Sequence, residues 1–514
     1  MSSQQYRSTR SSSTSQLSFE EAVMTGLAPD GGLFLPSVIP QLPETFLTEW
    51  KDLSFQELAF KILRLYINPQ EIDDAGLQTL ISKSYSTFRS PKVTPLHKIY
   101  NDINILELFH GPTYAFKDVA LQFVGNLFEY FLTRKNAHLA ADSKDRHHIT
   151  VVGATSGDTG SAAIYGLRNK KDVSVFILYP TGKISAIQEE QMTTVEDANV
   201  HTLSVTGNFD DCQGIVKEIF GDVEFNSKYH VGAINSINWA RILAQITYYF
   251  YSYFELLRSS NKSPEELKVK YVVPSGNFGD ILAGYFAKKM GLPIAKLVIA
   301  TNENDILDRF MKSGKYEKES SEVKATYSPA MDILISSNFE RLLWYLVRNN
   351  LGNDQAAADL QAGETLNNWM KDLKAGKPIE VDAKTLEAAR ADFDSERVSN
   401  SETIETIKLV YRESSQSYVI DPHTAVGVKA THLQKAKDTE SFDYVSLSTA
   451  HPAKFSDAVS KALSTFSGYN FEADVLPAEL KALSTKEKRI KLVPNPSVKV
   501  VEDIIVEELA KENA

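Results

Sequence analysis

Residues 110–122 read HGPTYAFKDVALQ, and the lysine of this stretch, Lys117, stands where a loop enters an apolar helix. Apolar residues recur on one face of that predicted helix, at Ala120, Phe123, Val124, Leu127, Phe128 and Phe131. The beginning of the helix should therefore be buried, and burial lowers the pKa of a lysine. A neutral lysine amine can form a Schiff base with an aldehyde.

Two glycine-rich turns lie downstream, GATSGDTG at 153–160 and PSGNFGD at 274–280, each between a strand-like run and a helix-like run. Backbone N–H groups that converge at a helix N-terminus bind anions. The second turn predicts a phosphate cup formed by Gly276, Asn277, Phe278, Gly279 and Asp280. A connection without a ligand is a second interpretation of this turn. The first turn suits a carboxylate, with Thr155, Ser156, Asp158 and Thr159 as candidates, and a dinucleotide-binding turn or plain helix capping is its second interpretation. Together with Lys117, the two turns indicate pyridoxal 5'-phosphate, which carries an aldehyde and a phosphate.

Strand-like and helix-like runs alternate along most of the chain. The strand-like runs are INILEL at 103–108, ITVVG at 149–153, VSVFIL at 173–178, VHTLSV at 200–205, YVV at 271–273, KLVIA at 296–300 and DYVSLS at 443–448. Such alternation predicts an α/β fold with two open sheets of parallel strands joined by right-handed crossovers. Ligands of such sheets bind at the carboxyl ends of the strands, where Thr449 and Lys454 follow the last run.

The pattern predicts six regions. Residues 1–97 form an N-terminal, mainly helical region with a disordered start, and residues 98–145 form the lysine segment that links the α/β domains. A smaller α/β domain at 146–230 is followed by a larger cofactor-binding α/β domain at 231–348. Residues 349–401 form a helical insertion without sheet signal, and residues 402–514 complete the larger domain and end in a C-terminal tail. The first sixteen residues are Ser-rich and lack acids, so a disordered tail is favoured over a targeting segment. A capping box at Ser18 and Glu21 begins the first helix.

Composition excludes several classes of function. The chain has 514 residues and a net charge of −11, from 55 basic and 66 acidic residues, which gives no electrostatic footprint for nucleic acid. The sequence lacks the long uncharged apolar stretch that a membrane helix requires, and we expect a soluble, cytoplasmic protein. The one cysteine, Cys212, excludes disulfides within the chain and Cys-based metal clusters. His147 and His148 are adjacent on a strand and point to opposite faces, so we expect no metal site.

A series of motifs along the chain resembles that of the threonine synthase family. It comprises YRSTR at 6–10, DGGLFLP at 30–36, HGPTYAFKDVALQ, GATSGDTG, GNFDDCQ at 207–213, NSINWARILAQ at 235–245, SGNFGD, ATNENDIL at 300–307, SPAMDILISSNFERL at 328–342, IDPHTAVG at 420–427 and STAHPAKF at 448–455. These matches span nearly the whole chain, and several resemble this family rather than its wider fold group. The insertion before residue 420 resembles the fungal and bacterial branch.

The resemblance implies a fold-type II pyridoxal-phosphate enzyme that converts O-phospho-L-homoserine and water into L-threonine and phosphate. It implies that Lys117 holds the cofactor and moves protons, and that the Thr449 hydroxyl lies against the pyridine nitrogen. Candidate ligands of the substrate phosphate are Asn208, Asn238, Arg241 and Lys454, although Arg241 could equally pair with a surface carboxylate.

Three other functions remain open at this point. A serine or threonine dehydratase would share the lysine and the phosphate cup but should lack cations for a second phosphate. A noncatalytic binding protein of the same fold would be favoured by loss of Lys117 or of the cup, and both are present. A nicotinamide dehydrogenase fits the α/β pattern but not the spacing of the glycines. The oligomeric state is not predicted.

Overall fold

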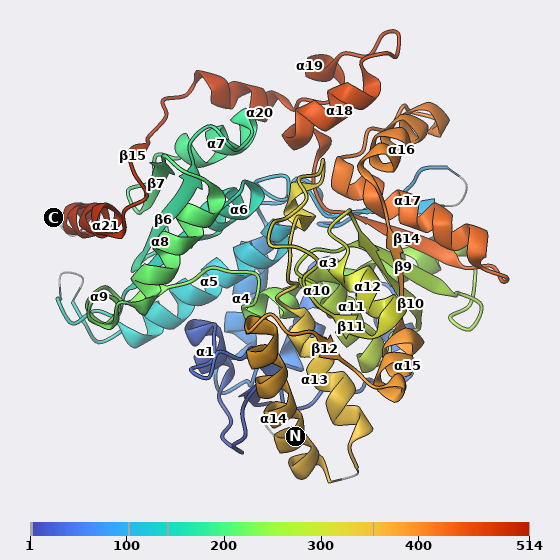
Figure 1. Cartoon of the computed structure of the whole chain (residues 1–514), viewed down its shortest axis with the longest axis horizontal. Helices are drawn as coiled ribbons and strands as arrows, with labels where there is room; N and C mark the ends of the chain where they lie inside the picture. Colours follow the sequence, from blue (N-terminus) through green and yellow to red (C-terminus); the bar gives the residue numbers. More distant parts are fainter. Residues whose placement is uncertain (1–3, 101–102, 141–142, 353, 513–514) are drawn as a thin grey trace.

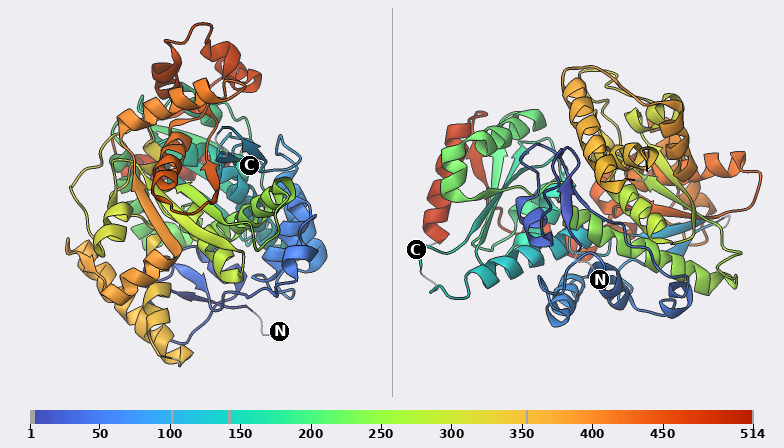
Figure 2. Two further views of the ribbon diagram at one scale, coloured as in Figure 1. Left: turned by 90° about the vertical axis from the view of Figure 1, so that its right-hand side faces the viewer. Right: turned by 90° about the horizontal axis from the view of Figure 1, so that it is seen from below.

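The computed structural model describes residues 4–100, 103–140, 143–352 and 354–512. The chain forms two lobes, each built on one open sheet with helices on both sides (Figure 1). Seen from below, the lobes lie side by side with the N-terminal helices beneath them (Figure 2). The predicted α/β class with two open sheets is confirmed. Among the described helices, none is long and apolar enough to cross a membrane.

The larger lobe contains a six-stranded sheet in the order β13-β10-β9-β14-β4-β3. Its strands are β3 (Leu96–Lys98), β4 (Ile103–Glu107), β9 (Val269–Pro274), β10 (Ile294–Thr301), β13 (Phe393–Arg397) and β14 (Asp443–Ser448). All neighbours pair in parallel except β3, which is antiparallel to β4. Because β14 pairs with both β9 and β4, the carboxyl ends of these three strands meet at one edge of the sheet.

Helices cover both faces of this sheet. The long α10 (Trp239–Ser260) is almost entirely buried and packs between α3 (Phe55–Arg64), α5 (Lys117–Lys135) and α11 (Gly279–Met290). Apolar side chains of α16 (Asn400–Glu413), α17 (Pro422–Lys437) and α18 (Ser456–Leu463) form a separate core with β4. The remaining helices of this lobe and of the N-terminal region are α1 (Phe19–Thr25), α2 (Phe46–Glu49), α4 (Asp74–Tyr85), α12 (Ile306–Ser313), α13 (Phe339–Asn350), α14 (Gln355–Lys374) and α15 (Ala383–Asp392).

The smaller lobe contains a parallel five-stranded sheet in the order β15-β7-β6-β5-β8. Its strands are β5 (Ile149–Ala154), β6 (Val173–Pro180), β7 (Val200–Val205), β8 (Val231–Gly232) and β15 (Lys491–Val493). Its helices are α6 (Asp158–Leu167), α7 (Ala186–Thr193), α8 (Phe209–Gly221), α9 (Val223–Tyr229) and α21 (Val498–Glu512), and α8 packs with α21 over one face. The short α19 (Phe471–Asp474) and α20 (Ala478–Lys481) lead from α18 to β15.

The prediction that residues 402–514 complete the larger domain and end in a tail is wrong for residues 491–512. Residues 491–512 complete the smaller lobe, because β15 pairs with β7 and α21 buries Val501, Ile505 and Leu509 against α8 and the sheet. The run KLV is too short to stand out as a strand in the sequence, and its partner lies almost three hundred residues earlier.

The disordered start predicted for the N-terminus is also wrong over residues 6–10. Strand β1 (Tyr6–Ser8) pairs with β2 (Phe34–Pro36), and Tyr6 is fully buried. The Thr9 hydroxyl and the Arg10 guanidinium both bind the carboxylate of Glu340 in α13. Polar side chains that look solvated in the sequence are thus fixed by a carboxylate far away in the chain. The predicted capping box at Ser18 is present.

The insertion is helical as predicted, with α14 and α15, but the expectation that it adds no strand is wrong. Strand β13 pairs with β10 and forms the edge of the larger sheet, and β12 (Ile379–Glu380) pairs with β11 (Lys315–Tyr316). The β13 sequence FDSER is mostly polar because an edge strand is half solvated, so its composition does not predict a strand.

Candidate active site

Three consecutive strand ends of the larger sheet bring the predicted site residues together. The glycine turn at 275–279 follows β9, Thr449 follows the adjacent β14, and the lysine segment follows β4 on the other side. Two backbone hydrogen bonds join the last two segments: the Phe116 amide donates to the Thr449 carbonyl at 2.8 Å, and the His451 amide to the Tyr114 carbonyl at 3.0 Å. Thr449 therefore lies between the glycine turn and Lys117.

Lys117 is the first residue of α5, and its side chain is partly buried. Burial lowers the pKa of the Lys117 amine to about 8; the Asp158 carboxylate opposes this shift, and the Arg241 and Lys454 cations add to it. A lysine with this pKa is partly neutral near pH 8 and can attack an aldehyde. The structure therefore places a nucleophilic amine where the sequence predicts one.

The glycine turn has its carbonyl groups turned away from the site. The Ser336 hydroxyl donates to the Gly276 carbonyl at 2.6 Å, and the backbone and side-chain amides of Asn338 donate to the Asn277 carbonyl at 3.0 and 2.9 Å. Within the described part of the chain, no hydrogen bond uses the backbone amides of residues 276–279. The Ser275 hydroxyl is buried and also lacks a partner. These free donors at the N-terminus of α11 fit a phosphate.

Two predicted members of this cup direct their side chains elsewhere. Phe278 has a left-handed backbone conformation, with φ of 64°, and its ring packs against Phe339 and Phe393 in the core. The Asp280 carboxyl is buried against Tyr248 and Tyr249 of α10. Only the backbone amides of these two residues are thus available to a ligand, because a side chain that completes the core or binds a neighbouring helix cannot also turn toward the cup.

The turn at 155–160 is folded by its own first residue. The Thr155 hydroxyl accepts hydrogen bonds from the amides of Gly157 and Gly160, at 3.0 and 2.8 Å. The hydroxyl is thus used within the turn, and the role of Thr155 as a substrate ligand stays a prediction. Gly157 has φ of 146°, which favours glycine. Among the described hydrogen bonds, none uses the amides of Ser156 or Thr159, at the N-terminus of α6.

The Asp158 carboxylate forms a buried ion pair with Lys454, at 2.6 Å. Its pKa is lowered well below the usual range: burial opposes the shift, and the Lys454 and Lys117 cations outweigh burial. The Lys454 ammonium also donates to the Thr113 carbonyl at 2.9 Å. Thr113 is held in turn by Asp118, which accepts from its amide and its hydroxyl. Sequence reasoning missed this supporting network, although Thr113 and Asp118 flank Lys117.

Arg241 is buried in α10 beside Lys117, and burial lowers the pKa of its guanidinium to about 10. One of its terminal nitrogens donates to the Asn235 carbonyl at 2.8 Å, and its Nε atom has no partner. The alternative prediction, that Arg241 pairs with a surface carboxylate, is therefore wrong. A buried cation with an unused donor fits an anionic ligand.

The two predicted asparagine ligands have structural roles. Asn208 caps α8, and its side chain accepts from the Asp211 amide. Asn238 caps α10 and donates to the Val23 carbonyl at 2.9 Å. Each side chain caps a helix, and their predicted role as phosphate ligands stays a prediction. Cys212 is buried in α8, and burial raises the pKa of its thiol to about 11.

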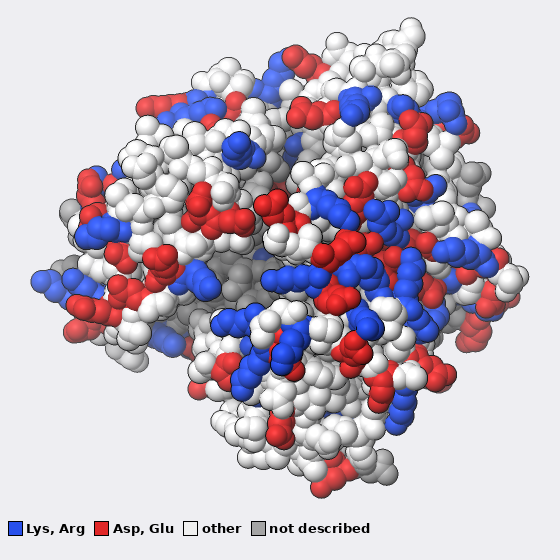
Figure 3. Space-filling view, in the orientation of Figure 1, with Lys and Arg blue, Asp and Glu red and all other residues white. Residues whose placement is uncertain are grey.

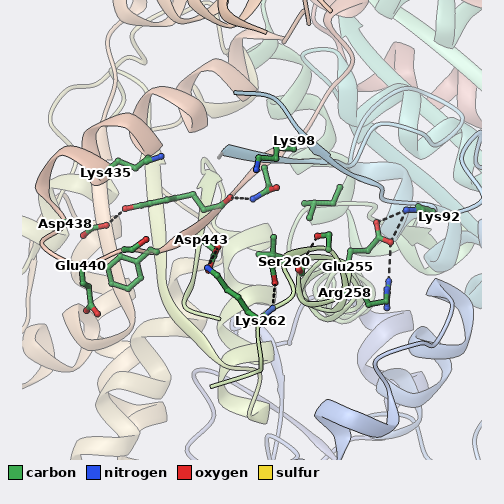
Figure 4. A pocket seen from close by; sticks show the side chains of 17 residues that line it. Lys92, Lys98, Glu255, Arg258, Ser260, Lys262, Lys435, Asp438, Glu440 and Asp443 are labelled. Carbon is green, nitrogen blue, oxygen red and sulfur yellow. Dashed lines mark hydrogen bonds and ion pairs between the residues drawn. The ribbon is translucent and has the colours of Figure 1, made fainter. Parts of the chain in front are cut away.

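The surface is hollowed between the two lobes, and both basic and acidic side chains lie around the hollow (Figure 3). A separate cavity of about 840 Å³ lies at the opposite, amino ends of β4 and β14 (Figure 4). Its walls include the ion pairs Lys92–Glu255 and Lys262–Asp443. Because ligands of parallel sheets bind at the carboxyl ends, the candidate active site is the group around Lys117.

Comparison with known proteins identifies the family. A model of pyridoxal-phosphate-dependent enzymes matches residues 89–449, and models of the threonine synthase N-terminus and C-terminal region match residues 5–85 and 424–505. The chain is 66% identical to threonine synthase of Saccharomyces cerevisiae over 99% of both chains. The chain belongs to the threonine synthase family. It is a pyridoxal-phosphate-dependent enzyme, and the free donors at 275–279 together with Lys117 fit that cofactor.

Solved structures of other threonine synthases agree with this assignment. The structure of the yeast enzyme has a TM-score of 0.94 at 65% identity and covers 99% of both chains. A threonine synthase from Brucella melitensis, solved with bound pyridoxal phosphate, has a TM-score of 0.86 at 39% identity and covers 98% of this chain and 99% of its own. The resemblance seen in the motifs and the fold-type II architecture are thus confirmed.

Proposed function

We propose that the protein converts O-phospho-L-homoserine and water into L-threonine and inorganic phosphate. The observation that carries this proposal is the presence of two separate anion sites around one lysine, the amide cup at 276–279 and the buried cations Arg241 and Lys454. A phosphorylated cofactor and a phosphorylated substrate require both. When bound, pyridoxal phosphate withdraws electrons from the substrate carbons that lose protons.

The cup amides would hold the cofactor phosphate at the end of β9, and the Lys117 amine would bind the aldehyde. The Thr449 hydroxyl, at the end of β14, would be a neutral hydrogen-bonding partner of the pyridine nitrogen. The Lys117 amine, once free of the aldehyde, would take protons from Cα and Cβ and deliver protons to Cγ, which loses the phosphate, and to Cα. Water supplies the hydroxyl at Cβ, and its remaining proton balances the released phosphate.

The α6 N-terminus binds the substrate carboxylate through the amides of Ser156 and Thr159. The Asp158 carboxylate next to them would repel an anion, but Lys454 neutralises it across 2.6 Å. Arg241 contributes its unpartnered Nε to the substrate phosphate, and Lys454 adds a second positive charge. Positive charge at this point stabilises the phosphate as it leaves.

The substrate is a small molecule, and we propose no nucleic-acid or membrane partner. The net charge of −11 supports the proposal that nucleic acid is not a partner. The single buried cysteine and the biosynthetic reaction support a cytoplasmic location.

The proposal is tested by incubating purified holoenzyme with O-phospho-L-homoserine and measuring threonine and phosphate. We expect equal amounts of both products. Formation of 2-oxobutyrate from threonine, with no phosphate release from O-phospho-L-homoserine, would instead show a dehydratase. In the Arg241→Ala variant, we expect KM for the phosphorylated substrate to rise at least tenfold, because one buried cation is lost. An unchanged KM would remove Arg241 from the substrate site.

A further inference from the structure

The helix that begins at the phosphate cup carries an acidic residue in its first turn. Asp280 is the second residue of α11, and its side chain is buried. The N-terminus of a helix attracts negative charge, and the proposed cofactor phosphate already brings a negative charge to this end. Two anions at one helix N-terminus repel each other. An acidic residue here therefore requires a physical explanation, which its surroundings supply.

Two tyrosines of α10 hold Asp280 on one side only. The hydroxyls of Tyr248 and Tyr249 donate to Oδ1 at 2.5 and 3.0 Å, and the Tyr249 hydroxyl also lies 2.9 Å from the Asp280 carbonyl oxygen. The second carboxyl oxygen, Oδ2, is buried and lacks a partner. An ionised carboxylate with one bare oxygen in the interior is costly, whereas the protonated acid leaves no buried charge.

The elements that pack against α11 are α10, β9, β10 and α13. From α10 come the Tyr248 and Tyr249 hydroxyls; from β9 comes Tyr271, which donates to the Tyr249 carbonyl. Strand β10 and helix α13 bring no charged group that acts on Asp280, and within the described chain no cation pairs with it. Burial raises the pKa of the Asp280 carboxyl to about 7, although both tyrosine hydrogen bonds oppose this shift.

We propose that Asp280 is a positioning residue of the cofactor-phosphate site: buried between Tyr248 and Tyr249, its protonated form anchors the first turn of α11 to α10 without repelling the phosphate. The inference rests on the proposed binding of the cofactor phosphate at 276–279. Because a bound phosphate disfavours the ionised form of Asp280, phosphate binding and protonation of Asp280 favour each other. Affinity for the phosphate should then fall as the pH rises above about 7.

The test uses pyridoxamine 5'-phosphate, which lacks the aldehyde and so cannot bind Lys117 covalently. Its dissociation constant is measured by calorimetry for the full-length apoenzyme and for Asp280→Asn, an uncharged side chain of the same shape, between pH 6 and pH 9. The ligand and Lys117 titrate equally in both proteins. We expect the ratio of the wild-type to the variant constant to rise, by up to about tenfold per pH unit above the Asp280 pKa. A ratio that does not change with pH would overturn the proposal.

A second measurement does not depend on the folding of Asp280→Asn. At pH 8, where the ligand phosphate is already a dianion, calorimetry of the Lys117→Ala protein in two buffers of different ionisation enthalpy counts the protons taken up on binding. We expect net uptake, and zero uptake would contradict the proposal. The cup itself is tested separately with pyridoxamine, which lacks the phosphate: if it binds as tightly as the phosphorylated form, the cup is misplaced, whatever Asp280 does.

Discussion

Replacement of Lys454 by methionine removes one partner of the buried pair that Lys454 forms with Asp158. The two side chains are 0% and 7% exposed, and their charged atoms are 2.6 Å apart. In the variant, the Asp158 carboxylate keeps only the Gln188 amide as a hydrogen-bond donor, at 3.0 Å, besides the more distant Lys117 charge. Loss of one partner of a buried ion pair costs about 3–5 kcal/mol of folding free energy. We expect a destabilisation of this order at pH 8.

The destabilisation should depend on pH with a defined sign. In the wild type, the lowered pKa of Asp158 contributes stability above its unfolded pKa, and this contribution is lost as the pH falls through the folded value. Without Lys454 the carboxyl is buried with less compensation, so its pKa rises above the unfolded value and protonation relieves the cost. The difference between variant and wild type should therefore be smaller at pH 5 than at pH 8.

The assay is urea unfolding followed by circular dichroism, with apoenzyme in all samples. Lys499→Met is a matched control, because Lys499 pairs with Asp503 on α21 while both side chains remain exposed, and we expect little or no change. The double variant Lys454→Met with Asp158→Asn should be more stable than the single Lys454 variant, because no unpaired charge remains buried. The reasoning is refuted if Lys454→Met costs no more than Lys499→Met, or if the double variant gains nothing.

Three further predictions follow from the same structure. Capture of pyridoxal phosphate by the apoenzyme requires the neutral Lys117 amine, so its rate should rise with pH and level off above about pH 8; a midpoint near the ordinary lysine value of 10.5, by absorbance, would contradict the lowered pKa. Gly125→Ala should prevent close packing of α5 on α6 and lower the melting temperature, because the added methyl group would lie 1.8 Å from the Gly166 carbonyl oxygen. Gly214→Ala is the control and should leave the melting temperature unchanged, because the space around Gly214 is open. Ser336→Ala should weaken cofactor binding about three- to tenfold by fluorescence titration, because one hydrogen bond that turns a cup carbonyl outward is lost; unchanged affinity would show that the cup needs no such support.

Local sequence signals predicted the parts of the site that single segments form. Lys117 at the beginning of a buried helix and the glycine turn at 276–279 are of this kind, because periodicity and glycine spacing record them directly. The structural roles of Asn208 and Asn238 show the limit of local signals: an asparagine before a helix is a common cap, and the fold shows that both residues cap helices.

Long-range pairing explains what the sequence did not reveal. The ion pair of Asp158 with Lys454 joins the two lobes across almost three hundred residues, and Ser336 supports the cup from a loop sixty residues away. Segments β13 and β15 form strands because they pair with β10 and β7, and their own composition does not predict a strand. The side chains of Lys454 and Ser336 bind groups far away in the chain, so no local pattern predicts their partners.

The most direct test of the account is to identify the lysine that holds the cofactor. Holoenzyme is reduced with borohydride, digested, and analysed by mass spectrometry for a peptide that carries the pyridoxyl phosphate group. The account predicts the label on Lys117, within residues 110–122, together with bleaching of the cofactor's visible absorbance band. A label on Lys454, the other lysine of the site, would contradict the assignment and exchange the roles of the two amines.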